Sequence, residues 1–367
     1  MKHEQGTTTT AAGPAEPVTG AVPGASPRRA VPRAGRQRAG RALTRPEPWR
    51  RGPLLTASAL LLGLVLLLHA EIPNRGWHLG SLLESGLPWL GACVPLLLAA
   101  ALWRRSAAAV LALLLPVAAW LHLFGGLLVD KSGPGGDLTV VEQNVNADNP
   151  DPAATARHLA GSGADLLALV ELTPQTVKVY ETGLAEVYPH HTVRGTVGLW
   201  SRLPLGDTRP IDVMGYAPQV DGEPVEGWTD VGNRALRTTV TTDRGPLPVY
   251  VAHLGSVRVG LAAGFRTASR DTGVRALVRA LAADRSERAL LLGDLNGTLD
   301  DRALAGLTAG MRSAQDTAGA GFGFSYPASF PLVRIDHVLL RGLTATGARV
   351  LPADGSDHLP VAARIAW

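Results

Sequence analysis

The sequence predicts an α/β protein in which helix-covered β-sheets pack on each other, preceded by three membrane-spanning helices. Three observations lead to this fold class. Three long apolar spans lie within residues 54–129, and short apolar runs alternate with a few helical patterns over residues 138–367. Several of those runs are apolar throughout, which is typical of strands buried on both faces. The length of 367 residues has room for two or three domains, so a membrane part and one large α/β domain fit it.

The first segment, residues 1–53, is basic and has little with which to build a core. It carries ten Lys and Arg against three Glu, eight prolines, and Trp49 as its only aromatic residue. Too little apolar surface is present to offset the entropy of ordering the backbone, so we predict a disordered tail. Its arginines could form a nucleic-acid-binding arm, but their position beside an apolar span favours a basic segment next to a membrane.

The three apolar spans are Leu54–Ala70, Leu87–Trp103 and Ala107–Val129, of 17, 17 and 23 residues. About 17–25 helical residues cross the hydrocarbon core of a bilayer, so each span is long enough. None of the three spans contains Asp, Glu, Lys or Arg, and His122 is the only ionisable residue of the third. Buried helices of a soluble protein are the alternative, but none of the spans has a polar face to offer to water. We therefore predict three transmembrane helices over residues 54–129.

Basic residues predict the orientation of these helices. The loop 71–86 carries only Arg75, whereas ten basic residues precede the first span and Arg104 and Arg105 lie between the second and the third. The positive-inside rule then places the tail in the cytoplasm and residues 138–367 outside the cell. The sequence thus predicts a multi-pass protein of the cell membrane with a cytoplasmic N-terminus and an extracytoplasmic domain.

The outer domain follows a glycine-rich linker, residues 130–137, and is mildly acidic. Residues 130–367 carry 22 Lys and Arg and 26 Asp and Glu. The pI of about 9.6 therefore comes from the tail. This balance excludes a basic protein that wraps nucleic acid. The only cysteine is Cys93, which excludes a disulfide scaffold and agrees with an exported domain that needs no reduced thiols.

Strands outnumber helices in the outer domain. Helical patterns fall at Pro152–Ala160, Ala263–Asp284 and Asp301–Ala309. The β-rich runs are Leu138–Asn144, Asp165–Glu171, Val197–Ser201, Leu236–Thr242, Leu247–Leu254, Ala289–Asn296, Ile335–Arg341 and Val361–Trp367. No glycine fingerprint or phosphate loop follows a strand, so packed, helix-covered sheets fit the pattern better than a dinucleotide-binding sheet.

Polar residues recur where these apolar strands end. They are Asn144, Glu171, His253, Asp294, Asn296, and, around what we expect to be the final hairpin, Asp336, Asp357 and His358. A carboxylate at the end of a buried strand needs a cation or a hydrogen-bond donor, because burying it alone is costly. Carboxylates and amides without cysteine form an oxygen-rich set that favours Mg²⁺ or Mn²⁺ over zinc. Histidines near carboxylates suit acid–base work on a phosphate ester.

Taken singly, each residue has a structural interpretation as well. Asn144 alone is a common turn former, and His253 alone is more often a satisfied core histidine. Asp294 before Asn296 fits an Asx turn, and Asp357 with His358 fits an ordinary loop pair. The order of the residues along the chain makes the case for a site.

That order resembles the endonuclease/exonuclease/phosphatase superfamily over almost all of residues 138–367. The matching stretches are VVEQNVN with Asn144, LLALVEL with Glu171, GLWSRLPL, VAHLGS with His253, LLLGDLNGTLD with Asp294 and Asn296, FSYP and RIDHVLL with Asp336, and GSDHLPV with Asp357 and His358. The aspartate-asparagine stretch is the most specific of them. The resemblance implies a four-layer α/β sandwich, as in DNase-like enzymes, and a Mg²⁺- or Mn²⁺-dependent hydrolase of phosphate esters.

The resemblance also implies roles for the residues. Glu171 would bind the metal, helped by Asn144 and Asp357. Asp294 and Asn296 would face the scissile phosphate. His358, oriented by Asp336, would be the general base or a phosphate-facing histidine, and His253 an acid or a phosphate donor.

The substrate is less well indicated than the chemistry. The Trp-Cys-Asp-Arg stretch of the inositol phosphatases is missing, and a net negative domain disfavours duplex DNA. Three spans before such a domain resemble an actinobacterial branch linked with teicoplanin resistance, which implies a lipid-linked phosphate such as undecaprenyl pyrophosphate at the outer face. An extracellular surface nuclease and a catalytically silent membrane sensor or binding module are the alternatives. The sequence gives no oligomeric state.

Overall fold

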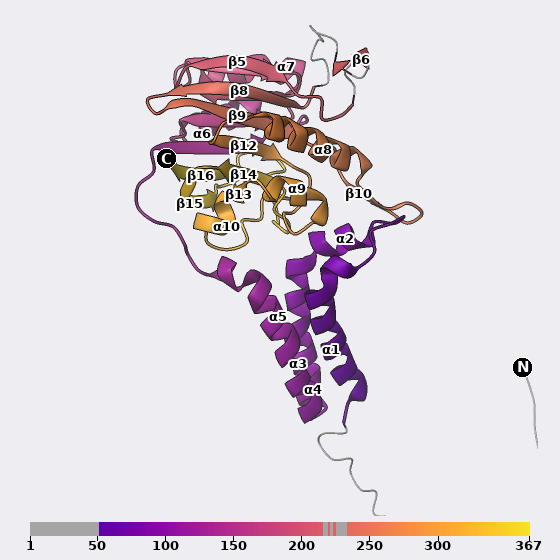
Figure 1. Cartoon of the computed structure of the whole chain (residues 1–367). Helices are drawn as coiled ribbons and strands as arrows, with labels where there is room; N and C mark the ends of the chain where they lie inside the picture. The colour runs from indigo at the N-terminus through magenta and orange to yellow at the C-terminus, as the bar shows by residue number, and fades with distance from the viewer. Residues whose placement is uncertain (1–50, 216–218, 221–222, 225–232) are drawn as a thin grey trace, which may run out of the picture. The chain divides into compact units, whose positions relative to one another are not determined.

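The computed structural model describes residues 51–215, 219–220, 223–224 and 233–367 (Figure 1). The predicted basic tail, residues 1–53, lies almost wholly outside them. The first described part is helical. Its α-helices are α1 (Pro53–Leu68), α2 (Leu79–Ser85), α3 (Cys93–Trp103), α4 (Ala107–Ala112) and α5 (Leu114–Phe124), and its 3₁₀ turns are η2 (His69–Glu71), η3 (Leu87–Ala92) and η4 (Gly125–Leu128).

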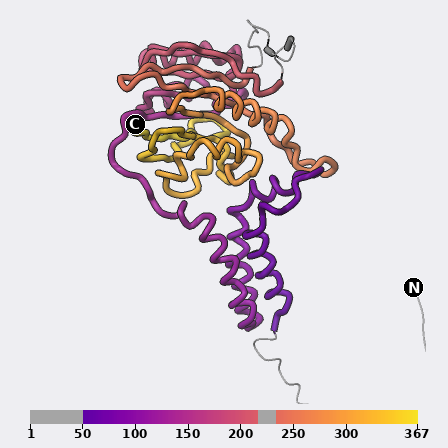
Figure 2. Tube along the Cα trace, in the orientation of Figure 1, coloured from indigo at the N-terminus to yellow at the C-terminus, as the bar shows by residue number. Residues whose placement is uncertain are grey.

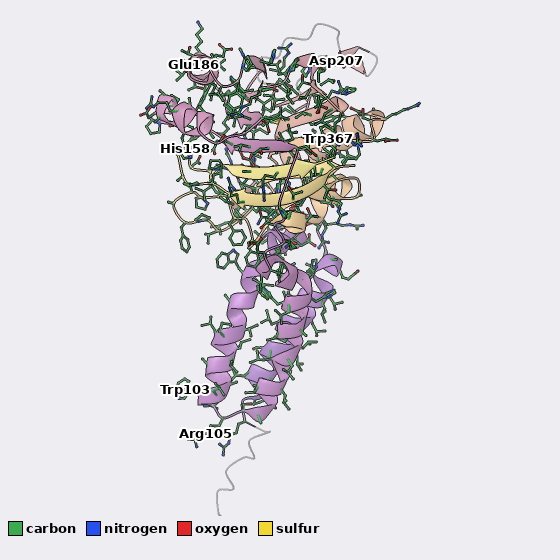
Figure 3. The ribbon with its side chains drawn as sticks, turned by 90° about the vertical axis from the view of Figure 1, so that its left-hand side faces the viewer. Trp103, Arg105, His158, Glu186, Asp207 and Trp367 are labelled. Carbon is green, nitrogen blue, oxygen red and sulfur yellow. The ribbon has the colours of Figure 1, made fainter. Side chains whose placement is uncertain are left out.

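Two helical stretches, Pro53–Glu71 and Ala107–Leu128, are long and apolar enough to cross a membrane. A third becomes possible if Leu79–Ser85 and Leu87–Trp103, which meet at a bend of 67°, count as one span. The three predicted apolar spans are thus all helical, but the second begins as a 3₁₀ turn with Pro88 near its start. Trp103 and Arg105 lie at the turn between α3 and α4 (Figure 3).

Two six-stranded sheets form the second part. The first has the order β15-β16-β1-β2-β4-β3, and the second β13-β14-β12-β9-β8-β5. The bounds in the first sheet are β1 (Leu138–Asn144), β2 (Leu166–Val170), β3 (His190–Arg194), β4 (Val197–Ser201), β15 (Thr344–Val350) and β16 (Val361–Ala366). Those in the second are β5 (Leu205–Pro210), β8 (Ala235–Thr242), β9 (Gly245–His253), β12 (Ala289–Asp294), β13 (Arg312–Ser313) and β14 (Asp336–Arg341). Two small ribbons pair β6 (Gln219–Val220) with β7 (Glu223–Pro224) and β10 (Arg258–Gly260) with β11 (Gly264–Arg266).

Helices cover the outer face of each sheet, which gives the four layers that the sequence predicts. Leu159 of α6 (Pro152–Ala160) and Tyr180 of α7 (Pro174–Leu184) pack on Leu167 of the first sheet. Leu277 of α8 (Ala268–Ala283) packs on Leu291 of the second, together with η5 (Arg302–Leu304) and α9 (Ala305–Thr308). The short α10 (Ala314–Ala318) lies near β15. The layers can be followed along the Cα trace in Figure 2.

Alternation along the strands explains why the sequence shows unbroken apolar runs. In β2, Leu166, Ala168 and Val170 belong to the core between the sheets, whereas Leu167 and Leu169 belong to the core under α6 and α7. Successive side chains of a strand point to opposite faces, and here both faces are buried. The same alternation decides which polar residues at the strand ends point between the sheets.

The chain departs from its predicted elements at residues 263–267. The sequence predicts a helix from Ala263, but α8 begins at Ala268, and Gly264–Arg266 form strand β11. Gly264 has φ 66°, and a Cβ there would lie 2.5 Å from the carbonyl oxygen of Trp77. The Phe265 amide donates to that same carbonyl over 2.9 Å. This long-range contact turns the predicted first turn of the helix into a hairpin.

Gly293, the residue before Asp294, provides a test of the sheet packing. It has φ 153°, and a Cβ would lie 1.8 Å from the carbonyl oxygen of Ala252 in β9. We predict that Gly293→Ala lowers the free energy of unfolding by at least about 3 kcal/mol, because it adds both a clash and a strained φ. Gly206→Ala in β5 is the matched control, since no atom lies within 4 Å of its Cβ. Thermal unfolding in detergent should separate the two variants, and equal midpoints would contradict the packing described here.

Candidate active site

Five strands bring the predicted residues to one edge of the sandwich. In the second sheet, Asp294 at the end of β12 stands opposite His253 at the end of β9 and Asp336 at the start of β14. In the first sheet, Asn144 ends β1 and pairs with Val170, the residue before Glu171. Because the core residues of β9, β12 and β14 have the same parity as these polar ones, their side chains point into the layer between the sheets.

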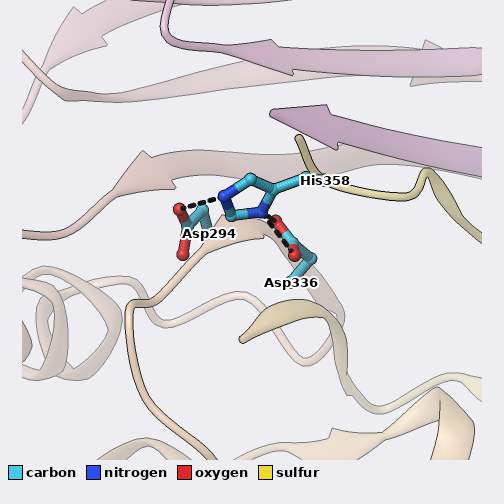
Figure 4. A group of neighbouring side chains, drawn as sticks. All are labelled: Asp294, Asp336 and His358. Carbon is cyan, nitrogen blue, oxygen red and sulfur yellow. Dashed lines mark hydrogen bonds and ion pairs between the residues drawn. The ribbon is translucent and has the colours of Figure 1, made fainter. Parts of the chain in front are cut away.

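His358 and Asp336 form a buried pair. His358 Nδ1 lies 2.9 and 3.1 Å from the two carboxylate oxygens of Asp336, to which it donates (Figure 4). The Ser325 hydroxyl donates to the same carboxylate over 2.5 Å. The expectation that the pair spans the final hairpin was wrong, because Asp336 starts β14 in the second sheet whereas His358 precedes β16 in the first. The pair therefore links a residue of one sheet with a residue next to the other sheet.

Asp294 lies at the centre of the site. Its carboxylate accepts from the Asn296 amide over 2.8 Å and from Asn144 Nδ2 over 3.1 Å. The two histidines approach it from opposite sides, with His253 Nε2 at 3.7 Å and His358 Nε2 at 4.0 Å from Oδ2. Figure 4 shows the His358 ring between Asp294 and Asp336. One carboxylate therefore faces two imidazoles and two amides.

Glu171 faces His253 from the other sheet. Its Oε1 lies 3.4 Å from His253 Nε2, and its Oε2 accepts from the Ala147 amide over 3.2 Å. Glu171 and Asn296 both adopt left-handed backbone conformations, with φ 64° and 48°. Side-chain-bearing residues rarely adopt these conformations, and such strain gathers at functional sites. It turns both side chains out of the strand direction at the point where their strands end.

A cavity of about 370 Å³ opens over these groups. Asp357, the remaining predicted residue, is exposed and lines the cavity with Glu171, Asp294, Asn296 and His358. Asn144 and His253 lie beneath it, fully buried. The structure therefore brings all eight predicted site residues together, six from strand ends and two from the loop before β16.

Burial and neighbouring charges shift the pKa values of the central groups in opposite directions. Burial, followed by the Asp336 charge, raises the pKa of Asp294 to about 7. Burial lowers the pKa of His358, but the adjacent Asp336 and then Asp294 outweigh it and raise that pKa to about 9. Near neutral pH His358 is thus a cation, and Asp294 is poised to gain or lose a proton.

His253 has the opposite electrostatics. Burial, then the charges of Arg234 and His358, holds the pKa of His253 well below its ordinary value. Arg234 Nη2 lies 2.7 Å from its Nδ1 and 2.8 Å from its Nε2. Nε2 is also the ring atom that faces Glu171 and Asp294. A neutral imidazole can donate one hydrogen bond and accept another, so His253 supplies a neutral polar group rather than a store of protons.

Sequence reasoning missed several residues of the site. Glu142 lies two residues before Asn144 on the same face of β1, is fully buried, and its carboxylate oxygens have no hydrogen-bond partner among the described residues. Its burial and the charges of Asp336 and Asp294 raise its pKa well above the ordinary value. An acidic residue inside an apolar strand was the available signal. Arg234 gave none, because a single arginine before a strand is unremarkable.

The crowding of carboxylates fits a bound divalent cation. Asp294, Asp336 and Asp357 act on His358, and Glu171, Asp294 and Asp357 line the cavity. Asp294, Asp336 and His358 also offer ligand atoms within 4.8 Å of one another. The Asp336 oxygens, however, already accept from His358 and Ser325, so Glu171 and Asp357 are the more suitable carboxylates, with the buried Asn144 beneath them.

Comparisons with known proteins identify the family of this chain. A family model described as the Endonuclease/Exonuclease/phosphatase family matches residues 141–358, more than half of the chain. The chain belongs to this family, whose enzymes act on phosphate esters. A comparison with curated protein sequences gave no match.

Solved structures show the same fold. A conserved protein of unknown function from Enterococcus faecalis V583 is 17% identical, with a TM-score of 0.51 over 62% of this chain and 99% of that one. A mannosyl-6-phosphatase from Bacteroides thetaiotaomicron is 14% identical, with a TM-score of 0.49 over 63% and 100%. A magnesium-bound β-toxin variant from Staphylococcus aureus is 15% identical, with a TM-score of 0.46 over 62% and 99%. At these identities the likeness concerns the fold.

The His358–Asp336 pair predicts a pH dependence of stability. Because the folded pKa of His358, about 9, exceeds its ordinary 6.5, its contribution is fully present below pH 6.5 and is lost as the pH rises through 9. The stability difference between the wild type and His358→Gln should shrink by up to about 3 kcal/mol across this range. Thermal unfolding of both proteins in EDTA measures it. A difference that stays constant with pH would show that the pair is not ionised in this way.

Proposed function

We propose that the protein is a membrane-anchored, divalent-metal-dependent phosphohydrolase that acts on a lipid-linked or membrane phosphate ester at the outer face of the cell. The single observation that carries this proposal is the cavity itself. Asp294 and His358 line it together with Ser85, which ends α2 between the first two apolar stretches. The groups that would attack a phosphate ester thus share one cavity with the membrane part of the chain.

Each residue has a role in this proposal. Glu171, Asn144 and Asp357 would hold Mg²⁺ or Mn²⁺, which neutralises charge on the phosphoryl oxygens. Asp294, with its pKa near neutrality, takes a proton from the attacking water. The His358 imidazolium, held by Asp336, and the neutral ring of His253 donate hydrogen bonds to the phosphoryl oxygens. Asn296 fixes the Asp294 carboxylate through its backbone amide.

Two alternatives were open from the sequence. A catalytically silent module is disfavoured because the complete set of polar groups converges on one cavity with shifted pKa values. A surface nuclease is disfavoured by the net negative charge of residues 130–367. The resemblance to the teicoplanin-resistance branch makes undecaprenyl pyrophosphate the first substrate to test.

Activity of the full chain in lipid nanodiscs tests the function. We expect release of phosphate from undecaprenyl pyrophosphate, and little cleavage of plasmid DNA, with Mg²⁺ or Mn²⁺ but not with EDTA. Glu171→Ala should raise the metal concentration needed for half-maximal activity, whereas Glu186→Ala, an exposed residue after α7 that does not line the cavity (Figure 3), should not. Full activity in EDTA would refute the proposed dependence on a divalent metal. Activity on DNA alone would favour the alternative of a surface nuclease.

The His358–Asp336 pair predicts non-additive losses of activity. His358→Ala should lower kcat by at least about 10²-fold, the usual contribution of a preorganised hydrogen-bond donor to the transition state, and Asp336→Asn should act in the same direction. The double variant should cost little more than His358→Ala, because the residues act as one unit. His158→Ala, on the exposed face of α6, is the matched control. Circular dichroism checks folding. If the double variant lost activity by the product of the two single fold-losses, Asp336 and His358 would act independently and would not form one unit.

The proposed orientation predicts labelling from outside the cell. Asp243 is exposed in the turn between β8 and β9. In a Cys93→Ala background, Asp243→Cys should react with a membrane-impermeant maleimide added to intact cells. Arg105→Cys, between α3 and α4, should react only after the membrane is opened. The reverse pattern would invert the topology.

A further inference from the structure

Among the described residues after 129, the exposed large apolar side chains lie in two segments. They are Val259 and Leu261 in the β10–β11 hairpin, and Tyr326 and Phe330 in the loop before β14. Leu261 is fully exposed, and Val259 and Phe330 are more than two-thirds exposed. Single exposed apolar residues are ordinary, but four that gather in two segments beside one cavity indicate a binding surface.

Both segments border the mouth of the catalytic cavity. The hairpin contributes Phe265 and the preceding Val257 to the cavity lining. The loop contributes Tyr326 and Val333. The Tyr326 ring lies 4.7 Å, centroid to centroid, from that of His358. The apolar side chains therefore form a rim around the opening through which a substrate must reach Asp294.

The two segments are also fastened to the connection between the first and second apolar stretches. The Phe265 amide donates to the Trp77 carbonyl over 2.9 Å, so the hairpin lies beside the chain that enters α2 (Figure 1). Trp89 Nε1 donates to the Leu332 carbonyl over 2.8 Å. Trp77 and Trp89 are themselves 56% and 44% exposed. Tryptophans at the ends of apolar spans mark the level of the lipid headgroups.

A buried ionic network makes this attachment rigid. The Arg302 guanidinium donates to both carboxylate oxygens of Glu84, over 2.9 Å each, and to the carbonyls of His69 and Ile72. Ser81 donates to Asp301 over 2.8 Å, and Asp301 pairs with the fully buried Arg270. Glu84 and Asp301 are 1% and 0% exposed. The loop after Asp294 is thus joined to α2 by a bidentate ion pair and by a buried hydrogen bond, and removal of Arg302 would leave the Glu84 carboxylate buried without its partner.

Two exposed arginines complete the rim. Arg258 and Arg266 stand opposite each other across the hairpin, directly behind its apolar tip. An apolar tip followed by basic residues matches the boundary between acyl chains and phosphate headgroups of a bilayer. The same arrangement offers no large flat face to a folded partner.

We propose that the rim of the catalytic cavity docks on the outer leaflet of the bilayer that the chain's own helices cross, with Val259, Leu261 and Phe330 in the lipid and the two arginines at the headgroup phosphates. This inference rests on the membrane anchoring in the proposed function. Its consequence is that a lipid phosphate reaches Asp294 along the leaflet surface, without leaving the membrane. Soluble phosphate esters would have to enter from the side of the cavity that faces water.

Fluorescent labels test the docking without any enzyme assay. In the full-length Cys93→Ala protein, Leu261→Cys carries an environment-sensitive nitrobenzoxadiazole label in nanodiscs of phosphatidylglycerol and doxyl-labelled phosphatidylcholine. We expect blue-shifted emission and quenching by the doxyl lipid at this position. Asp243→Cys is the matched control, because its turn lies at the other end of β9, roughly 25 Å from His253, and should show neither. An unquenched, water-like spectrum at Leu261 overturns the proposal.

A kinetic comparison separates this inference from the proposed function. The pair Val259→Asp and Leu261→Asp should reduce turnover of the lipid phosphate in nanodiscs at least tenfold while leaving the thermal midpoint unchanged. Turnover of a short-chain, water-soluble analogue should not fall. Equal losses on both substrates, or on neither, would contradict docking of the rim. Quenching of the label in the Leu261→Cys protein, combined with a wild type that is inactive on the lipid phosphate, would instead refute the proposed substrate and retain the docking.

Discussion

The balance of charge between the two sheets is the constraint on which the rest of the site depends. Glu142, Asp294 and Asp336 are buried in one layer, where burial and the charge of Asp336 raise the pKa of both Glu142 and Asp294. His358 reaches in from the opposite sheet and pairs with Asp336, so its charge offsets part of theirs. Removing either partner of this pair would leave the other charge buried and unpaired, which is costly. The same contact therefore serves the packing of the sheets and the chemistry of the site.

Burial and neighbouring charges also explain why the pKa values of the two histidines shift in opposite directions. Burial lowers the pKa of both rings, but the Asp336 carboxylate outweighs it at His358, whereas the Arg234 charge adds to it at His253. Both rings face Asp294, so one carboxylate has a charged imidazolium and a neutral imidazole as neighbours. Two buried residues of one type thus acquire different charges from their partners. A bound divalent cation on the Glu171 side would complete the balance of charge.

The membrane part belongs structurally to the site. A glycine-rich linker alone would let the outer domain move freely over the bilayer, and the sequence indicates no other tether. The structure adds the Glu84–Arg302 and Ser81–Asp301 contacts, which join α2 to the loop after β12. Loops that carry catalytic residues need such support, because a small misplacement of a reacting group is costly to the rate. With the helices in a bilayer, as proposed, the apolar rim and the cavity would share one orientation toward the lipid.

The sequence by itself determined the fold class, the strands β1 and β4 and the helix α6 to the residue, and it named the eight polar residues that the structure gathers at one cavity, because unbroken apolar runs and the polar residues that end them are local signals. It missed α7, although Thr173 and Pro174 mark its start, and it placed a helix where Trp77 imposes the β10–β11 hairpin. Only the tertiary structure decided that Asp336 and His358 meet across two sheets, that Glu142 and Arg234 belong to the site, and that α2 lines the cavity. Those facts depend on contacts between residues 19 to more than 200 positions apart, and no local pattern encodes the charge that a distant neighbour brings.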